Sequence, residues 1–142
     1  MSAVPADLIA LYEAALYRVE LPGGRETLRL GAPIPPRLRD WIAALPGDGA
    51  AYLTACNPLG ERQDGAMNDA AMARLRALVE ARGWPWLEGE GVDPQALWPA
   101  EPSLLIGLES EIQARRLGRA FHQNALVWID KAGGARLVLL RE

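Results

Sequence analysis

A short run of apolar residues, from Ala50 to Ala55, constrains the fold of this chain more than any other segment. The run includes Tyr52 and Thr54, which favour strands, and it is too short to form a helix before Asn57-Pro58 interrupts it. A strand that is apolar throughout needs cover on both faces. We therefore predict a buried strand over residues 50–55 that lies in the centre of a sheet.

Helical and strand periodicities divide the rest of the chain into short elements. Apolar residues recur at helical spacing in four segments, which predict helices over residues 5–16, 38–45, 64–82 and 110–121. Asp64 or Asn68 is expected to cap the third helix and Ser110 the fourth, whose buried face would include Ile112 and Ala120. Strands are predicted over residues 17–21, 27–30, 84–88, 104–108, 125–129 and 136–140. A long loop with glycines and prolines is expected over residues 89–102.

This order of elements predicts the fold class. Hairpins at both ends of the chain and helices between strands favour an α+β fold with two layers, in which helices pack on one face of a mostly antiparallel sheet. The chain has 142 residues, of which half are apolar, and this fits a single domain over residues 1–142 with one core.

The charge balance and the cysteine count exclude several classes of protein. Fifteen basic and eighteen acidic residues are interspersed, so the chain lacks the single-sign patch that nucleic-acid binding requires. The only cysteine, Cys56, rules out an internal disulfide. The sequence shows neither a signal-peptide pattern nor an apolar run of the roughly 20 residues that span a bilayer. We expect a cytoplasmic protein without a nucleic-acid or membrane partner.

Motifs for common cofactors are missing from the sequence. It contains no Gly-Lys-Ser/Thr of a phosphate-binding loop, and Gly89-x-Gly91 runs into Pro94 where a dinucleotide-binding motif needs glycine. His122 and Cys56 alone are too few to hold structural zinc. Acidic loop residues usually face solvent, so a magnesium site is the weaker alternative. Its ligands would come from Glu61, Asp64, Glu88, Glu90, Asp93 and Glu101. We expect no metal and no cofactor.

Cys56 and His122 are the obvious candidates for a nucleophile and its base. Each adjoins a predicted strand, and such pairs meet in space rather than in sequence. The alternative is structural: Cys56 ends an apolar strand, where a free cysteine behaves as a small buried hydrophobe, and His122 follows a helix, whose dipole favours its positive form. Neither neighbourhood supplies a recognisable activating group, so we favour the structural interpretation.

Polar side chains gather at the ends of the predicted elements. Asn57 follows the central strand, which places its amide at the carboxyl edge of that strand, and Pro58 is expected to hold the exit extended. The alternative is that Asn57 closes an Asx turn and that the other groups are separate caps and turns. Together they predict a polar pocket, with Trp98 as an apolar wall and Arg62 as the partner of an anion. The candidate pocket residues are Thr54, Asn57, Arg62, Asn68, Trp98, Glu101, Ser103 and Gln123.

Four blocks of sequence carry a family resemblance. They are Tyr52-Leu53-Thr54-Ala55-x-Asn57-Pro58, then Asn68 on a leucine-bearing helix, then Trp98-x-x-Glu101-x-Ser103-Leu104-Leu105, and Phe121-x-Gln123-x-Ala125-x-Val127. In this order, over about residues 50–138, the chain resembles the DUF3293 family of small bacterial proteins of unknown function. The family pattern has an aromatic residue in place of Cys56 and a glycine in place of His122. The resemblance implies no activity, substrate or cofactor; the positions it picks out are Thr54, Asn57, Pro58, Asn68, Glu101, Ser103, Phe121 and Gln123.

Three functions fit these residues. The first is a non-catalytic module that binds a small molecule or a protein partner, because amides recognise through hydrogen bonds and do not titrate near neutrality. The second is a small hydrolase or transferase with Glu101 as general acid or base and with Asn57 and Gln123 as hydrogen-bond donors. The third is an interaction protein that exposes Trp84, Trp86 and Trp98, although these side chains can also close the core. The sequence favours the first and leaves catalysis open.

Overall fold

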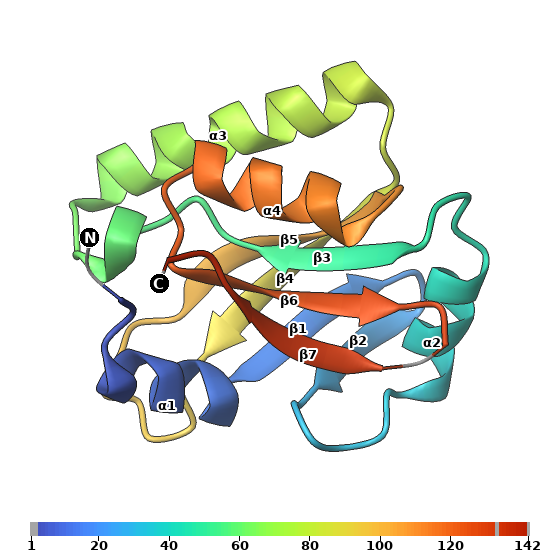
Figure 1. The fold of residues 1–142 in the computed structure, drawn as a ribbon, viewed down its shortest axis with the longest axis horizontal. Helices are drawn as coiled ribbons and strands as arrows, with labels where there is room; N and C mark the ends of the chain where they lie inside the picture. Colours follow the sequence, from blue (N-terminus) through green and yellow to red (C-terminus); the bar gives the residue numbers. More distant parts are fainter. Residues whose placement is uncertain (1–2, 133, 142) are drawn as a thin grey trace.

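A computed structural model describes residues 3–132 and 134–141. Seven strands form one antiparallel sheet in the order β2-β1-β4-β5-β3-β6-β7 (Figure 1). The strands are β1 (Leu16–Leu21), β2 (Gly24–Leu28), β3 (Gly49–Leu53), β4 (Trp86–Val92), β5 (Glu101–Leu108), β6 (Ala125–Asp130) and β7 (Ala135–Leu139). The predicted α+β class, with hairpins near both ends of the chain, is confirmed.

The prediction that the apolar run over residues 50–55 lies in the centre of the sheet is also confirmed. Strand β3 lies between β5 and β6, and all five of its residues are buried. Its side chains alternate, so that Ala51 and Leu53 join one hydrophobic cluster while Ala50 and Tyr52 join a second cluster on the other face. Fully burying one leucine side chain contributes roughly 1.5–3 kcal/mol, so both faces of β3 add substantially to stability.

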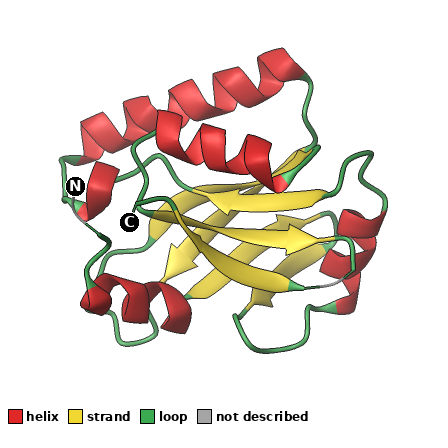
Figure 2. Cartoon of the chain, in the orientation of Figure 1, coloured by secondary structure: helices red, strands yellow, loops and turns green. Residues whose placement is uncertain are grey.

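Helices cover both faces of the sheet unequally, whereas the sequence predicted helices on one face only (Figure 2). The two longest, α3 (Gly65–Arg82) and α4 (Glu111–Ala120), pack together on one face. Helix α2 (Pro36–Ala43) packs on the opposite face, because Leu38 and Ile42 insert into the second cluster. Helix α1 (Ala6–Ala14) lies on that same side, at the end where the chain leaves β3.

The capping predictions can be compared with the observed helix ends. Asp64 accepts a hydrogen bond from the Met67 N–H at 2.8 Å and so caps α3, and Ser110 accepts one from the Gln113 N–H at 3.3 Å and caps α4. Each bond satisfies one of the N–H groups that a helix start leaves without a partner. Asn68, the other candidate cap, lies inside α3 and has a different role.

Two expectations about the sheet and α4 are wrong. Part of the loop predicted over residues 89–102 is strand, since β4 runs to Val92 and β5 begins at Glu101, where Gly91 pairs with Glu101. Glycine weakens a strand only moderately, and pairing with neighbours on both sides outweighs that cost here. In α4, Ile112 and Ala120 are exposed, because the buried face runs instead through Ala114, Leu117 and Gly118.

The sheet curls toward the side that carries α1 and α2. Residues of β1 and β6, such as Val19 and Val127, therefore share one cluster although the two strands are not neighbours in the sheet. Gly89 on β4 permits close packing inside this curl, because a Cβ there would lie 2.5 Å from the Arg18 carbonyl oxygen and 2.8 Å from the Tyr52 hydroxyl. Tyr52 donates its hydroxyl proton to that same carbonyl at 2.8 Å.

Candidate functional site

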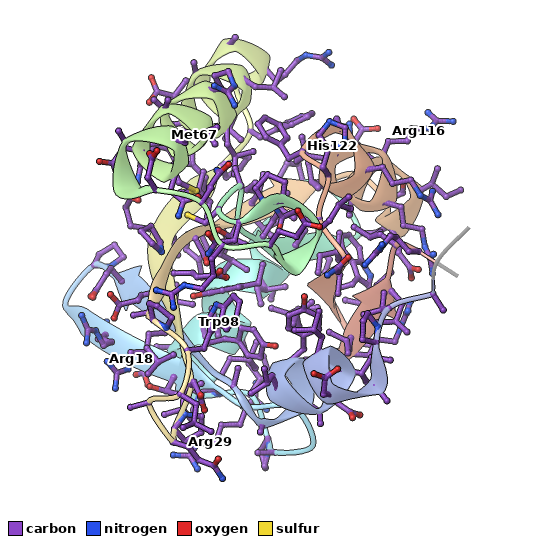
Figure 3. The ribbon with its side chains drawn as sticks, turned by 90° about the vertical axis from the view of Figure 1, so that its left-hand side faces the viewer. Arg18, Arg29, Met67, Trp98, Arg116 and His122 are labelled. Atoms are coloured by element: carbon purple, nitrogen blue, oxygen red, sulfur yellow. The ribbon has the colours of Figure 1, made fainter. Side chains whose placement is uncertain are left out.

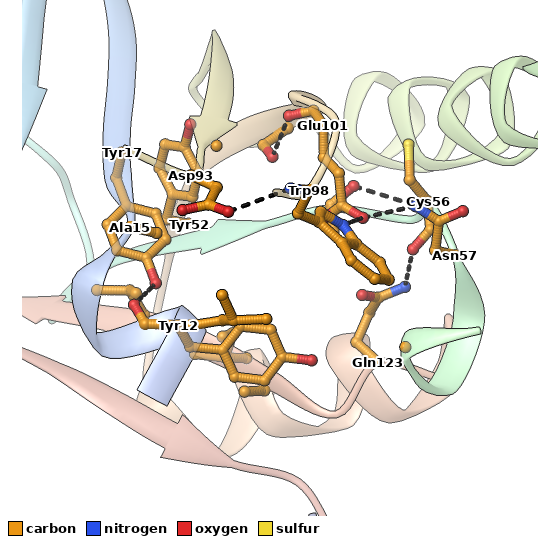
Figure 4. Close-up of a pocket in the computed structure, with 18 of the residues that line it drawn as sticks. Tyr12, Ala15, Tyr17, Tyr52, Cys56, Asn57, Asp93, Trp98, Glu101 and Gln123 are labelled. Atoms are coloured by element: carbon orange, nitrogen blue, oxygen red, sulfur yellow. Dashed lines mark hydrogen bonds between the residues drawn. The ribbon is translucent and has the colours of Figure 1, made fainter. Parts of the chain in front are cut away.

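A cavity opens on the curled side of the sheet, between α1, the ends of β3 and β6, and the loop over residues 93–100 (Figure 4). Its volume is about 110 Å³, somewhat smaller than the roughly 150 Å³ that holds a benzene molecule. One side, the polar wall, consists of Thr54, Asn57, Trp98, Glu101, Ser103 and Gln123. The other side, the apolar wall, consists of Leu8, Leu11, Ala15, Val127 and Leu137.

Six of the eight candidate pocket residues therefore line one cavity. The other two, Asn68 and Arg62, do not line it. Asn68 lies behind Asn57 and holds it in place through hydrogen bonds. Arg62 is exposed, and its guanidinium carbon lies 5.8 Å from the centroid of the Trp98 ring. Its cation lies over the ring of Trp98, which does line the cavity, and the pairing of Arg62 with an anion stays a prediction.

Asn57 adopts an unusual backbone conformation. Its φ of 47° and ψ of 64° are left-handed, whereas a residue before proline is normally extended, so the extended exit predicted for this segment is wrong. Asparagine tolerates this region better than most residues. The side chain fixes the conformation from three sides: Asn57 Oδ1 accepts from Gln63 N at 3.0 Å and from Asn68 Nδ2 at 3.1 Å, and Nδ2 donates to Glu101 Oε2 at 2.6 Å.

Backbone donors determine which way these amides face. The Asn57 N–H donates to Asn68 Oδ1 at 2.9 Å, so the oxygen of Asn68 must face it, and Asn68 Nδ2 then faces Asn57 Oδ1. The Gln63 N–H likewise requires an oxygen at Asn57 Oδ1. This leaves Asn57 Nδ2 directed at the Glu101 carboxylate. The network is thus an ordered chain of donors that ends on one acceptor.

Glu101 is the charged group of the polar wall. Its Oε2 accepts hydrogen bonds from Asn57 Nδ2 at 2.6 Å and from the Trp98 indole N–H at 3.1 Å. Burial raises the pKa of Glu101 above its ordinary value of 4.5, and the two hydrogen bonds oppose that rise because they favour the charged form. Among the described residues, no basic side chain forms an ion pair with it.

The loop over residues 93–100 places Trp98 against Glu101. Asp93 begins this loop, and its carboxylate accepts from the backbone N–H groups of Gln95 at 3.0 Å, Leu97 at 2.9 Å and Trp98 at 3.1 Å. Asp93 therefore shapes the turn that brings the indole N–H onto Oε2. Figure 4 shows Trp98 between Glu101 and Gln123.

The remaining polar groups are held by backbone partners. Thr54 donates to the Pro102 carbonyl at 2.7 Å and accepts from the Cys56 N–H at 3.0 Å, while Ser103 donates to the Glu101 carbonyl at 3.1 Å. Gln123 Nε2 donates to the carbonyls of Cys56 and Phe121, both at 3.2 Å. These contacts join the ends of β3, β5 and α4 to each other.

Sequence reasoning missed the tyrosines of the cavity. Tyr12 on α1 accepts from Asn124 Nδ2 at 3.2 Å, and the Tyr17 hydroxyl donates to the Tyr12 carbonyl oxygen. The rings of Tyr17 and Tyr52 pack edge to face with centroids 5.1 Å apart. Burial raises the pKa of all three hydroxyls, so they act as neutral hydrogen-bonding groups. The alternation of Tyr17, Val19 and Leu21 indicates an inward face but does not reveal the cavity.

The Cys56–His122 pair lacks the arrangement of a catalytic dyad. Cys56 lines the cavity, whereas His122 is exposed and lines a separate depression between α3 and α4 (Figure 3). Burial raises the pKa of the Cys56 thiol, which disfavours the thiolate that a nucleophile needs. His122 has a φ of 56°, a conformation that glycine adopts readily and that fits the glycine of the family pattern.

The side chains of Trp84, Trp86 and Trp98 do not form a single exposed face. Trp84 and Trp86 pack against the cluster under α3 and α4, and Trp98 belongs to the polar wall. Trp128 is buried, as expected of a core residue, with 3% of its surface exposed.

The described residues offer neither a metal-binding cluster nor a helix that could span a membrane. Within residues 3–132 and 134–141, no group of three or more His, Cys, Asp or Glu side chains is arranged to hold a metal ion. None of the helices in that part of the chain has the length and apolar character needed to cross a membrane.

Comparison with known proteins identifies the family. Searches of the curated proteins and of the solved structures found no match. A family model described as protein of unknown function (DUF3293) matches residues 53–126, just over half of the chain. The matched segment includes every residue of the polar wall, whereas the apolar wall lies outside it. The chain therefore belongs to the DUF3293 family.

Proposed function

We propose that this protein is a non-catalytic binding module that holds a small molecule in the cavity between its polar and apolar walls. The observation that carries the proposal is the convergence of Asn57, Trp98 and Glu101 on one side of an open cavity. A mostly apolar cavity with a few fixed polar groups is the usual form of a ligand site.

The fixed orientation of the polar wall supports binding. The Asn57 amide at 2.6 Å and the Trp98 indole N–H at 3.1 Å hold Glu101, so the wall need not rearrange when a ligand enters. Such preorganisation lowers the entropy lost on binding. The alternative is that these polar residues are unrelated caps and turns. Unrelated caps would not need to join in one network, yet side chains from β5, α3 and the segment after β3 do so.

The hydrolase or transferase alternative has less support. It needs Asn57 and Gln123 to donate hydrogen bonds to a substrate, yet the Nε2 of Gln123 gives both of its hydrogens to backbone carbonyls, and the Nδ2 of Asn57 keeps only one hydrogen after donating to Glu101. The raised pKa of Glu101 is the feature that still suits a general acid or base. We therefore propose binding, in the cytoplasm, without a nucleic-acid or membrane partner.

Native mass spectrometry of the purified protein tests the proposal directly. We expect a bound small molecule, or stabilisation of the wild type by members of a metabolite panel in thermal-shift measurements. The Glu101→Gln variant should lose or alter that response, while Glu61→Gln, at an exposed loop position, should keep it. Product formation from a stabilising compound would instead favour the enzyme alternative. No ligand in either measurement would overturn the proposal.

A further inference from the structure

We propose that the cavity selects ligands with a small nitrogen cation, an ammonium or guanidinium group, which donates hydrogen bonds to Glu101 and Gln123. This inference rests on the proposed binding function and names the chemical class of the ligand. It follows from the acceptors that the polar wall leaves open, from the charge of the cavity and from its size.

Two oxygens on the polar wall remain free to accept hydrogen bonds. The Oε2 of Glu101 takes both of its hydrogen bonds, and within the described part of the chain no donor contacts its Oε1. Gln123 is only 7% exposed, and its Oε1 has no donor partner among these residues. Both oxygens reach open space. The fully buried side-chain atoms that lack a hydrogen-bond partner are Asn124 Oδ1 and Arg141 Nε, and neither of the two oxygens is among them. A ligand in the cavity can supply the missing donors.

The orientation of the Gln123 amide is fixed by its partners. Carbonyl oxygens only accept, so the two carbonyls of Cys56 and Phe121 require nitrogen at that end of the amide. The oxygen must then take the opposite side, which faces the region beneath Trp98 in Figure 4. The free oxygens of Glu101 and Gln123 are therefore acceptors, whereas the donors left free on the polar wall and the tyrosines, among the described contacts, are the second N–H of Asn57 Nδ2 and the hydroxyl proton of Tyr12.

The charge of the cavity favours a positive ligand. Glu101 and Asp93 both line it, and no arginine, lysine or histidine of the described residues does. Asp93 already accepts hydrogen bonds from three backbone N–H groups. The Glu101 carboxylate forms no ion pair with a basic side chain of the described residues. A carboxylate taken from water is costly unless it is paired, so a bound cation would relieve this cost.

The size of the cavity limits the rest of the ligand. A volume of about 110 Å³ accommodates a nitrogen cation with a short apolar chain. That chain would lie against Leu8, Leu11 and Leu137 of the apolar wall. The cavity opens to solvent, so a larger molecule can place only its cationic end inside.

Three compounds of similar shape and different charge test this selectivity: n-butylammonium, 1-butanol and butyrate. Binding is measured by saturation-transfer NMR and by thermal shift on the wild-type protein. We expect n-butylammonium to bind at least about tenfold more tightly than 1-butanol, since a hydrogen bond to a charged group is worth about that factor, and butyrate not to bind. In Glu101→Gln the advantage of the ammonium should disappear, and Glu61→Gln should retain it.

The outcomes separate this inference from the proposed function. If 1-butanol or butyrate binds the wild type as well as n-butylammonium, the site binds small molecules but the cation inference is wrong. If none of the three binds and the metabolite panel is also silent, both proposals fail. The wild-type ranking stands without any variant, so a Glu101→Gln protein that does not fold leaves the test intact.

Discussion

The two walls of the cavity are built by different means. The polar wall is held by directional hydrogen bonds, such as those of Asn57 to Gln63, Asn68 and Glu101. The apolar wall depends on contact alone where it comes from α1, a helix with no fully buried residue and no side-chain cap. Directional bonds fix atom positions closely, whereas apolar contacts tolerate changes of shape. We infer that the polar wall sets which chemical group is accepted and the apolar wall adapts to what is attached to it.

The largest effect is expected when the polar wall is broken at Asn57. Asn57→Ala removes the partners of Gln63, Asn68 and Glu101 and places alanine in a left-handed conformation, so we expect a loss of about 3 kcal/mol in the free energy of unfolding. Urea denaturation measures it. Asn57→Gly is the control for the backbone, and it should recover about 1 kcal/mol. A loss below about 1 kcal/mol in Asn57→Ala would show that the network contributes little.

A smaller effect is expected at Thr54. Replacement by valine keeps the shape but removes the hydrogen bonds with Pro102 and Cys56, which should cost about 1.5 kcal/mol on the same denaturation assay. The matched control is Thr27→Val on β2, where the hydroxyl forms no hydrogen bond with another described residue. Equal losses in the two variants would contradict the role assigned to the Thr54 hydroxyl.

Shortening a side chain of the apolar wall should reduce stability less than breaking the polar wall. Leu11→Ala removes part of a half-buried side chain, so we expect a loss of about 1 kcal/mol in stability, together with weaker binding of n-butylammonium than in the wild type. Leu97→Ala, at a position that is 74% exposed, serves as the control and should change neither quantity. If Leu11→Ala destabilises the protein as much as Asn57→Ala, the two walls do not differ in the way described.

The smallest expected effect is a change with pH in the stability difference between the wild type and Glu101→Gln. The pKa of Glu101 is raised in the folded protein, so the folded state holds this proton more tightly than the unfolded state, and the resulting stability is lost as pH rises from the ordinary value of 4.5 through the raised one. Between about pH 4 and pH 7 the wild type should therefore lose stability relative to Glu101→Gln. Denaturation curves across this range measure the difference, with Glu61→Gln correcting for the loss of one charge. A difference that is constant with pH would contradict the raised pKa.

The sequence predicts the fold better than it predicts the cavity. The apolar run near Tyr52, the cap residues Asp64 and Ser110 and the terminal hairpins depend on local periodicity and local hydrogen bonds, which the chain displays directly. The extent of β4 and β5 escaped prediction because pairing between strands, which is not local, decides whether Gly89 and Gly91 are extended.

The sequence predicts which residues form the polar wall, but it does not predict their conformations or contacts. Asn57, Glu101 and Gln123 stand at element ends, where binding groups often occur, and the family resemblance includes all three. The left-handed backbone of Asn57 and the position of Arg62 on Trp98 depend on contacts between distant segments. The position of Tyr12 in the cavity was not predicted, because nothing in the local pattern of α1 indicates which residues this helix packs against.

The apolar wall also bears on the order in which the chain folds. It places Leu8 and Leu11 from an early helix beside Leu137 from a late strand, so almost the whole sequence must leave the ribosome before these side chains can meet. Contacts over such a separation form slowly, because closing a long loop costs entropy before any contact repays it. The polar wall, whose residues span only Thr54 to Gln123, can assemble on a nascent chain that has not yet made β7. The polar wall can thus form before β7 exists, and the apolar wall is complete only once Leu137 has been added.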